Sequence, residues 1–317
     1  MSAADPTRIV VALGGNAITR PGEEGTVEQD YANLRQSLRR VVGLVQGGAQ
    51  VVLTHGSGPQ VGNQMIRVEL ARGRAPDLPL DVVAADIQGG LGYMIERVLR
   101  NQLLRRGLTT PVCALLTQVE VDADDPALAR PTKFVGPAYD RGEAEQLQVE
   151  NGWRMHEDAG RGWRRVVPSP QPRRIVERDL IGRLVEWGAL VIVGGGGGIP
   201  VTRTPEGELV GVEAVIDKDL AAAVLARDVV ASDLYILTGV EQVYLDFGLP
   251  TQSGLRYLTL AQARGHLAAG QFPPGSMGPK VGAACQFVEA GGKRALITDA
   301  LTLDAALAGT TGTWITR

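Results

Sequence analysis

Lysine is the side chain whose scarcity points to chemistry in this sequence. Only four of the 32 basic residues are lysines, and the other 28 are arginines. Lysine carries a compact ammonium on a flexible stem, whereas arginine is a rigid planar fork, so the two are not interchangeable. Three of the lysines lie in motifs rich in Gly, Pro and Asp, namely Lys133, Lys218 and Lys280. Chance could scatter four residues this way, but a cluster of ammonium groups is typical of an enzyme that transfers a phosphoryl group.

Asp217 and Lys218 belong to the sharpest short motif, Ile-Asp-Lys-Asp at 216–219. Asp217 precedes an apolar helical pattern and could be its N-cap. A lysine is unfavourable at the positive end of a helix dipole unless an anionic ligand binds there. Lys280 also lies near an expected helix start. Lys133 lies in an irregular segment, from which it could enter a site only when that segment closes.

Glycine is the second compositional anomaly, with 41 residues in 317, or about twice the usual ~7%. Glycines follow four short apolar runs, at Gly14-Gly15, Gly56, Gly194 and Gly239. Such loops present backbone N–H groups to an anion because no side chain blocks the approach. The sequence has no Gly-x-x-x-x-Gly-Lys-Ser/Thr loop, and no Gly-x-Gly-x-x-Gly opens the first strand–helix unit. A dinucleotide oxidoreductase is therefore disfavoured.

The elements that must position these loops are read from apolar periodicity. Buried strands are predicted at 8–13, 50–54, 112–116, 189–193, 233–237, 295–297 and 313–315. Helices are predicted at 27–46, 80–106, 217–227 and 278–290, the second interrupted by Gly89, Gly90 and Gly92. Strands that alternate with helices indicate an α/β fold, a three-layer α/β/α sandwich with a mainly parallel central sheet. Ligands bind beyond the carboxyl ends of such strands, which is where the glycine loops lie.

Residues 118–170 break this pattern, since prolines, charges and aromatics mix there with weak periodicity. We interpret the segment as a small protruding lid subdomain within a single domain that spans 1–317.

Composition excludes several function classes. The net charge is −3 and the pI about 5.8, and no basic stripe indicates nucleic acid or an anionic membrane. No apolar run approaches the ~18 residues of a transmembrane helix, and no secretory signal is visible, so we expect a cytoplasmic protein. Cys113 and Cys285 offer neither metal-ligand spacing nor a disulfide framework.

His55, at a strand end, is a candidate for the wall of the site, but no Ser-His-Asp or Cys-His arrangement is present. That absence fits phosphoryl transfer, which needs mainly positioning and charge neutralisation from the protein.

A series of motifs in a fixed order then resembles a known family. The motifs are Val-Ala-Leu-Gly-Gly-Asn-Ala (11–17), His-Gly-Ser-Gly-Pro-Gln-Val-Gly (55–62), Leu-Thr-Gln-Val (116–119), Pro-Thr-Lys (131–133), Asp-Ala-Gly-Arg-Gly-Trp-Arg-Arg-Val-Val-Pro-Ser-Pro (158–170), Gly-Gly-Gly-Gly-Ile-Pro (195–200), Glu-Ala-Val-Ile-Asp-Lys-Asp (213–219), Leu-Thr-Gly-Val (237–240) and Gly-Ser-Met-Gly-Pro-Lys (275–280). From about residue 10 to the C-terminus the chain resembles carbamate kinase, of the amino-acid-kinase fold group. The 158–170 and 275–280 stretches separate it from acetylglutamate kinase, aspartokinase and uridylate kinase.

The resemblance implies a reversible, Mg²⁺-dependent reaction in which carbamoyl phosphate and ADP give ATP and carbamate. It assigns the transferred group and the carbamate to Gly14, Gly15, Asn16, Gly56, Ser57 and Gly58. It assigns catalysis to Lys133 on the lid, to Lys218 and Lys280 at phosphate oxygens, and to Asp217 as organiser of the lysines. The nucleotide pocket would contain Gly195, Gly196, Thr238, Gly239, Tyr244 and Met277. Mg²⁺ would bind to the nucleotide phosphates, without a dedicated set of protein ligands.

The resemblance also implies a division of labour along the chain. Residues 1–188 would form mainly the carbamate and phosphoryl-acceptor lobe, and residues 189–317 mainly the nucleotide lobe. The family is dimeric, and the glycine-interrupted helix after Leu80 is our candidate for part of the dimer face. One departure is Ser57, where the family form often has Asn; a serine hydroxyl has less reach.

Two alternatives remain open at this point. One is another small-acid kinase of the same fold, such as acetylglutamate kinase, which needs a larger pocket and usually lacks the 158–170 stretch. The other is a non-catalytic sensor of nucleotide or carbamoyl phosphate, which could dispense with a lysine, although none of the three is missing here.

The ammonium argument predicts that Lys218→Arg loses activity although its charge is kept. We expect kcat to fall by more than about tenfold, or ~1.4 kcal/mol of transition-state stabilisation, because a planar fork cannot replace a point charge. Steady-state kinetics with carbamoyl phosphate and ADP measure this. Lys293→Arg, which changes the lysine outside these motifs, is the matched control and should leave kcat unchanged.

Overall fold

A computed structural model describes residues 6–57, 59–158, 160–273 and 275–317. Its centre is an eight-stranded sheet whose strands follow one another in the order β15 (Tyr257–Thr259), β17 (Thr313–Thr316), β16 (Arg294–Asp299), β12 (Asp233–Thr238), β1 (Arg8–Leu13), β2 (Gln50–His55), β9 (Leu190–Ile192) and β3 (Val112–Ala114). Neighbouring strands are parallel except β16 and β17. The predicted parallel α/β sheet is confirmed.

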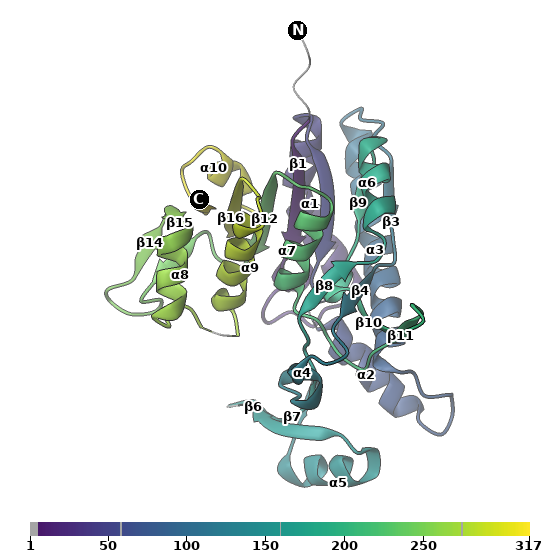
Figure 1. Cartoon of the computed structure of the whole chain (residues 1–317). Helices are drawn as coiled ribbons and strands as arrows, with labels where there is room; N and C mark the ends of the chain where they lie inside the picture. Colours follow the sequence, from purple (N-terminus) through teal and green to yellow (C-terminus); the bar gives the residue numbers. More distant parts are fainter. Residues whose placement is uncertain (1–5, 58, 159, 274) are drawn as a thin grey trace.

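Helices cover both faces of this sheet because successive side chains of each strand point to opposite faces. On β1, Val10 and Ala12 join one apolar core, while Val11 and Leu13 join the other. The first core receives side chains from α6 (Arg178–Glu186), α7 (Lys218–Asp228), α8 (Leu260–Ala268) and α9 (Met277–Glu289). The second receives side chains from α1 (Val27–Gln46), α2 (Gln60–Ala71), α3 (Leu80–Arg105) and α10 (Leu303–Leu307). The expected three-layer sandwich is therefore present (Figure 1).

Local sequence signals explain the ends of the main helices. Thr26 caps α1, because its side-chain hydroxyl accepts a hydrogen bond from the Gln29 backbone N–H. In turn, the Gln29 side-chain oxygen accepts one from the Thr26 backbone N–H. This reciprocal capping box fixes the start of the helix. The long helix α3 runs unbroken through Gly89, Gly90 and Gly92, because residues on its inner face, Ile95 and Leu99 among them, are fully buried.

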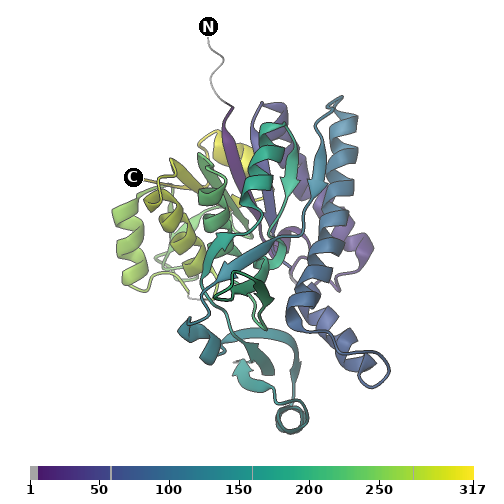
Figure 2. The same cartoon turned by 45° about the vertical axis from the view of Figure 1, so that its right-hand side comes forward.

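Residues 118–170, which we expected to be irregular, contain regular elements. A separate three-stranded sheet has the order β5 (Lys133–Tyr139), β7 (Gly162–Val167) and β6 (Arg154–Asp158), accompanied by α4 (Pro126–Ala129) and α5 (Arg141–Asn151). Figures 1 and 2 place this sheet and α5 at the lower end of the molecule, away from the large sheet. Helical and strand periodicity is weak here because much of each element faces solvent.

Smaller elements complete the chain. A four-stranded sheet has the order β11 (Leu209–Gly211), β10 (Ile199–Arg203), β4 (Gln118–Val121) and β8 (Pro172–Ile175), and β13 (Val243–Leu245) pairs with β14 (Ser253–Leu255). Two short 3₁₀ helices, η1 (Gly15–Ala17) and η2 (Gly195–Gly197), follow β1 and β9. Among the described residues, no helix combines the length and the apolar content that a membrane crossing requires.

Candidate functional site

Three lysines from three separate elements meet in one cleft of about 280 Å³ beside the carboxyl ends of β1 and β2. Lys133 begins β5, Lys218 begins α7, and Lys280 lies in the first turn of α9. We call this space the lysine cleft. Its lining residues are Gly15, Gly56, Ser57, Lys133, Gly196, Val215, Ile216, Asp217, Lys218, Asp219, Gly275, Ser276, Pro279 and Lys280. The structure thus brings all three predicted lysines and Asp217 together.

Two carboxylates hold the three ammonium groups. Asp217 Oδ2 lies 3.1 Å from Lys133 Nζ. The buried Asp219 is shared, with Oδ1 at 2.6 Å from Lys218 Nζ and Oδ2 at 3.2 Å from Lys280 Nζ. Charged hydrogen bonds of this kind are stronger than neutral ones. Since three positive charges face two negative ones, the cleft keeps a formal surplus of one positive charge, which suits an anionic substrate.

Asp217 has a second role as the N-cap of α7. Its Oδ1 accepts from the Asp219 and Leu220 backbone N–H groups at 2.9 and 3.4 Å. Burial acts to raise the pKa of Asp217, but the Lys133 ammonium and the Asp219 N–H together hold that pKa below its ordinary value. The carboxylate is therefore charged, and it is fixed at the start of the helix that carries Lys218.

Burial lowers the pKa of Lys280, and the nearby Lys218 charge lowers it further, while Asp219 opposes both effects. The Lys280 ammonium also donates to the Ser276 carbonyl at 3.1 Å. A lysine with a lowered pKa loses its proton at a lower pH than a solvent-exposed one. Asp219 is thus the group that keeps Lys280 charged.

The glycine loops after β1 and β2 lie close to neighbouring backbone and leave little room for side chains. The Gly14 N–H donates to the Leu237 carbonyl at 2.7 Å, and a Cβ on Gly14 would lie 2.7 Å from the same oxygen. A Cβ on Gly56 would lie 3.0 Å from Lys218 Cδ and 3.1 Å from Gly15 N. Both positions therefore need glycine for space. Gly58, which we also predicted as a binding residue, lies outside the described residues.

A second cavity, of about 220 Å³, adjoins the lysine cleft, since Lys280 and Ser276 line both. We call it the aromatic cavity. It is lined by Asn16, Thr238, Gly239, Val240, Tyr244, Phe247, Phe272, Pro273, Ser276, Met277 and Lys280. The Tyr244 and Phe247 rings lie 5.9 Å apart between centroids. Four predicted nucleotide residues, Thr238, Gly239, Tyr244 and Met277, line this cavity, and Asn16 connects it with the loop after β1.

Gly195 and Gly196 are not brought to the aromatic cavity. Strand β9 lies between β2 and β3, so the loop that follows it emerges on the opposite side of the site from β12. Gly196 lines the lysine cleft opposite Ser57, and Gly195 lies against the His55 ring. Gly196 therefore borders the lysine cleft, whereas Gly195 borders the cavity beside α3.

Comparison with known proteins gives this geometry a family. The model of the amino acid kinase family matches residues 7–299. Carbamate kinase from Pyrococcus horikoshii is 46% identical over 98% of this chain and 99% of its own. The chain belongs to the carbamate kinase family. A carbamate kinase-like protein, YahI of Escherichia coli K12, is 45% identical over 98% of both chains. The solved carbamate kinase of Giardia lamblia bound to AMP-PNP covers 98% of this chain and 99% of its own, with 39% identity and a TM-score of 0.92.

Asp219 was not predicted as a site residue, although it stands two residues after Asp217 in the same motif. Nothing in the local sequence indicates that its carboxylate reaches lysines on two helices. The available signal was the presence of a single lysine, Lys218 or Lys280, in each of two distant motifs, because each ammonium group needs an acidic partner. A buried acidic residue needs such partners to remain charged.

A second set of residues, which the sequence did not indicate, links the glycine loop after β1 to the glycine loop after β2. The Thr19 hydroxyl donates to buried Asp30 at 2.7 Å, and the Gln60 amide donates to Thr19 and Asp30 at 3.0 and 2.9 Å. Thr19 follows the loop of β1, and Gln60 begins α2 after the loop of β2. This network links the two loops, yet the partners of Asp30 are an uncharged hydroxyl and an uncharged amide, which no charge pattern in the sequence would reveal.

Asp219→Asn should narrow the pH range of the carbamate kinase reaction. Because the Asp219 charge raises the pKa of Lys280, its removal lowers that pKa. The predicted role of Lys280 requires its charged form, which is present below this pKa and lost above it. We expect the alkaline limb of the kcat/KM profile, which reports the free enzyme, to move to lower pH.

Asp179→Asn is the control, because Asp179 is an exposed carboxylate on α6 paired with Arg178. Its alkaline limb should coincide with that of the unmodified enzyme. An unshifted limb in Asp219→Asn would contradict the assigned role of Asp219.

Proposed function

We propose that this protein catalyses reversible phosphoryl transfer between carbamoyl phosphate and ADP. An oxygen of the ADP β-phosphate attacks the phosphorus, the bond from phosphorus to the carbamoyl oxygen breaks, and ATP and carbamate leave. Carbamate then decomposes to ammonia and carbon dioxide. We place the reaction in the cytoplasm, where ATP and ADP are available.

The observation that carries this proposal is the meeting of Lys133, Lys218 and Lys280 around Asp217 and Asp219. Phosphoryl transfer spreads charge over the oxygens of the transferred group, so catalysis is mainly positioning and electrostatic stabilisation. Lys218 and Lys280 neutralise those oxygens, and Lys133 reaches them from β5. The Gly14–Asn16 and Gly56–Gly58 loops hold the transferred group and the carbamate, and the aromatic cavity holds the nucleotide base.

Mg²⁺ enters this proposal as part of the nucleotide substrate. Throughout the described parts of the chain, no three or more His, Cys, Asp and Glu side chains are arranged to hold a metal. Asp217 and Asp219 already accept from ammonium groups. Mg²⁺ keeps several waters and commonly binds through substrate phosphates, and this charge distribution fits a metal that arrives with ADP or ATP.

The division of labour along the chain is also a proposal. Residues 118–170 form a lid that carries Lys133 over the site, within one domain of 1–317. The lobe of 1–188 binds mainly carbamate and the transferred group, and that of 189–317 binds mainly the nucleotide. The boundary is not strict in space, because β9 of the second lobe lies between β2 and β3 of the first.

We further propose a homodimer that forms through the outward face of α3. Gly89 and Gly90 are exposed there, and an added Cβ on either would meet nothing within 4 Å. Beside them the exposed Tyr93 and Leu116 border a cavity of about 370 Å³, and β3 is the edge strand of the large sheet. A second copy would cover this apolar surface and the unpaired strand edge.

The proposed activity predicts ATP formation from ADP, carbamoyl phosphate and Mg²⁺. A coupled assay with purified protein should give a rate well above that of the uncatalysed mixture. N-acetylglutamate with ATP is the matched acceptor control and should give no ADP. Absence of ATP from folded protein would leave the sensor alternative, and turnover of N-acetylglutamate would favour the other kinase.

The proposed dimer predicts a mass of two 33.6 kDa chains in light scattering after size exclusion. Gly90→Arg, which puts a long charged side chain on the outward face of α3, should shift the mass to one chain. Val149→Arg places the same side chain at an exposed position of α5 and should remain dimeric. Identical masses for both variants would exclude this face.

A further inference from the structure

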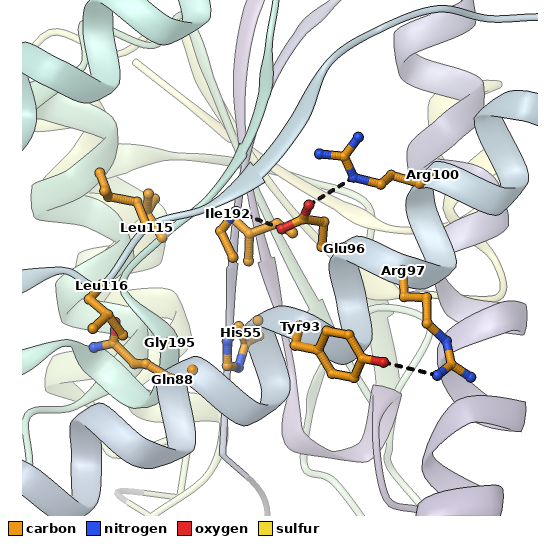
Figure 3. A pocket seen from close by; sticks show the side chains of 14 residues that line it. His55, Gln88, Tyr93, Glu96, Arg97, Arg100, Leu115, Leu116, Ile192 and Gly195 are labelled. Atoms are coloured by element: carbon orange, nitrogen blue, oxygen red, sulfur yellow. Dashed lines mark hydrogen bonds and ion pairs between the residues drawn. The ribbon is translucent and has the colours of Figure 1, made fainter.

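His55 is the last residue of β2, next to the loop that begins at Gly56, and it has no role in the chemistry described so far. Its side chain is buried, with 2% of its surface exposed. Figure 3 shows His55 on the wall of the cavity beside α3, with Gly195 on one side and Tyr93 on the other. The lysine cleft lies beyond Gly56, the next residue in the chain. His55 thus separates the two spaces.

The hydrogen bond of the ring fixes its protonation. His55 Nδ1 lies 2.9 Å from the Gly56 carbonyl oxygen. A carbonyl only accepts, so Nδ1 carries the proton and donates. Burial lowers the pKa of His55, although the bond to Gly56 opposes this effect. The ring is therefore neutral, with its one N–H directed at Gly56.

That bond determines the direction of the next backbone N–H. In a planar trans peptide, the C=O of one residue and the N–H of the following residue point in opposite directions. Because His55 holds the Gly56 C=O on its own side, the Ser57 N–H points away from His55. Gly56 and Ser57 line the lysine cleft on that far side, where Gly56 approaches Lys218 and Gly15 most closely.

The ring has little freedom to move. A Cβ on Gly195 would lie 2.4 Å from His55 Nε2 and 2.5 Å from Cε1, so the imidazole occupies the space that any other residue at 195 would need. The Gly56 N–H donates in turn to the Leu13 carbonyl at 2.8 Å. The His55–Gly56 peptide is thus held by the end of β1, and the Gly56–Ser57 peptide by the His55 ring, which in turn packs against the β9 loop.

We propose that His55 is a positioning residue for phosphoryl transfer, holding the Gly56 carbonyl so that the Ser57 N–H faces the transferred group. This inference rests on the proposed function. It adds a polar determinant outside the lysine cleft, and it gives a reason for histidine at this strand end. Backbone N–H groups aimed at developing charge are worth about 10²- to 10³-fold in rate when one is lost.

Two polar substitutions separate the hydrogen bond from the ring. His55→Asn can place its amide nitrogen where Nδ1 stands, whereas the amide of His55→Gln lies one bond further out and misses the Gly56 carbonyl. We expect His55→Gln to lower kcat by about tenfold or more and to change the KM for ADP by less than about twofold, because the aromatic cavity is untouched. His55→Asn should recover most of the lost kcat.

Kinetics of ATP formation and thermal midpoints are measured for both variants and for His55→Leu, which lacks a donor and stands in for His55→Gln if that variant does not fold. Equal losses of kcat in His55→Asn and His55→Gln, or full activity of the donor-less variants, would overturn the proposal. A loss that follows the fall in thermal midpoint, with the KM for ADP raised alongside, would assign His55 to folding instead. Turnover by the unmodified enzyme, measured in parallel, tests the proposed function separately.

Discussion

The site is governed by the mutual repulsion of three ammonium groups that must occupy one cleft. Like charges at short range in a partly buried place are costly, so each ammonium group needs a negatively charged partner. The enzyme meets this constraint with Asp217 and Asp219, two carboxylates that belong to the first turn of α7. Asp219 is shared by Lys218 and Lys280, so it holds two helices at a fixed distance and orients their charges together.

This arrangement makes α7 the element on which both structure and chemistry depend. One carboxylate caps the helix and pairs with the lid lysine, and the next pairs with the lysines of α7 and α9. The body of α7 consists of alanine, valine and leucine and is mostly buried, and it packs against both α9 and the large sheet. The helix start is therefore rigid, as pre-organised electrostatic catalysis requires.

The sequence was enough to predict the layers of the fold, because buried parallel strands are continuous apolar runs and their glycine stops are sharp. Strand β1 and helix α1 have the predicted bounds, and α3 differs only at its last residue. The elements within 118–170 were missed, since α5 and β6 bury few side chains and leave little periodicity to detect. Surface elements are fixed by hydrogen bonding and caps more than by a hydrophobic pattern.

For the site, residue types were more informative than strand order. Scarce lysines pointed to three residues that the structure brings into one cleft, because an ammonium group in a glycine-rich motif is unusual in a chain that otherwise uses arginine. The family resemblance assigned Gly195 and Gly196 to the nucleotide pocket, whereas the structure places them outside the aromatic cavity. Only the order of strands, with β9 next to β2, reveals on which side of the site that loop emerges. Asp219, Thr19 and Gln60 were missed because their partners are distant in sequence.

The pairing of β1 with β12 has a consequence for how reactants are spaced. Leu13 and Leu237 stand opposite each other in register. Strand β1 ends at Leu13 and β12 one residue later, at Thr238, so the loops that begin at Gly14 and Gly239 leave the sheet close together. Adjacent strands lie about 4.8 Å apart, and a hydrogen-bonded ladder stretches very little. The sheet itself therefore fixes the distance between these two loops, which we propose hold the transferred group and the nucleotide. A movement of the proposed lid, residues 118–170, would open or cover the cleft without changing that distance.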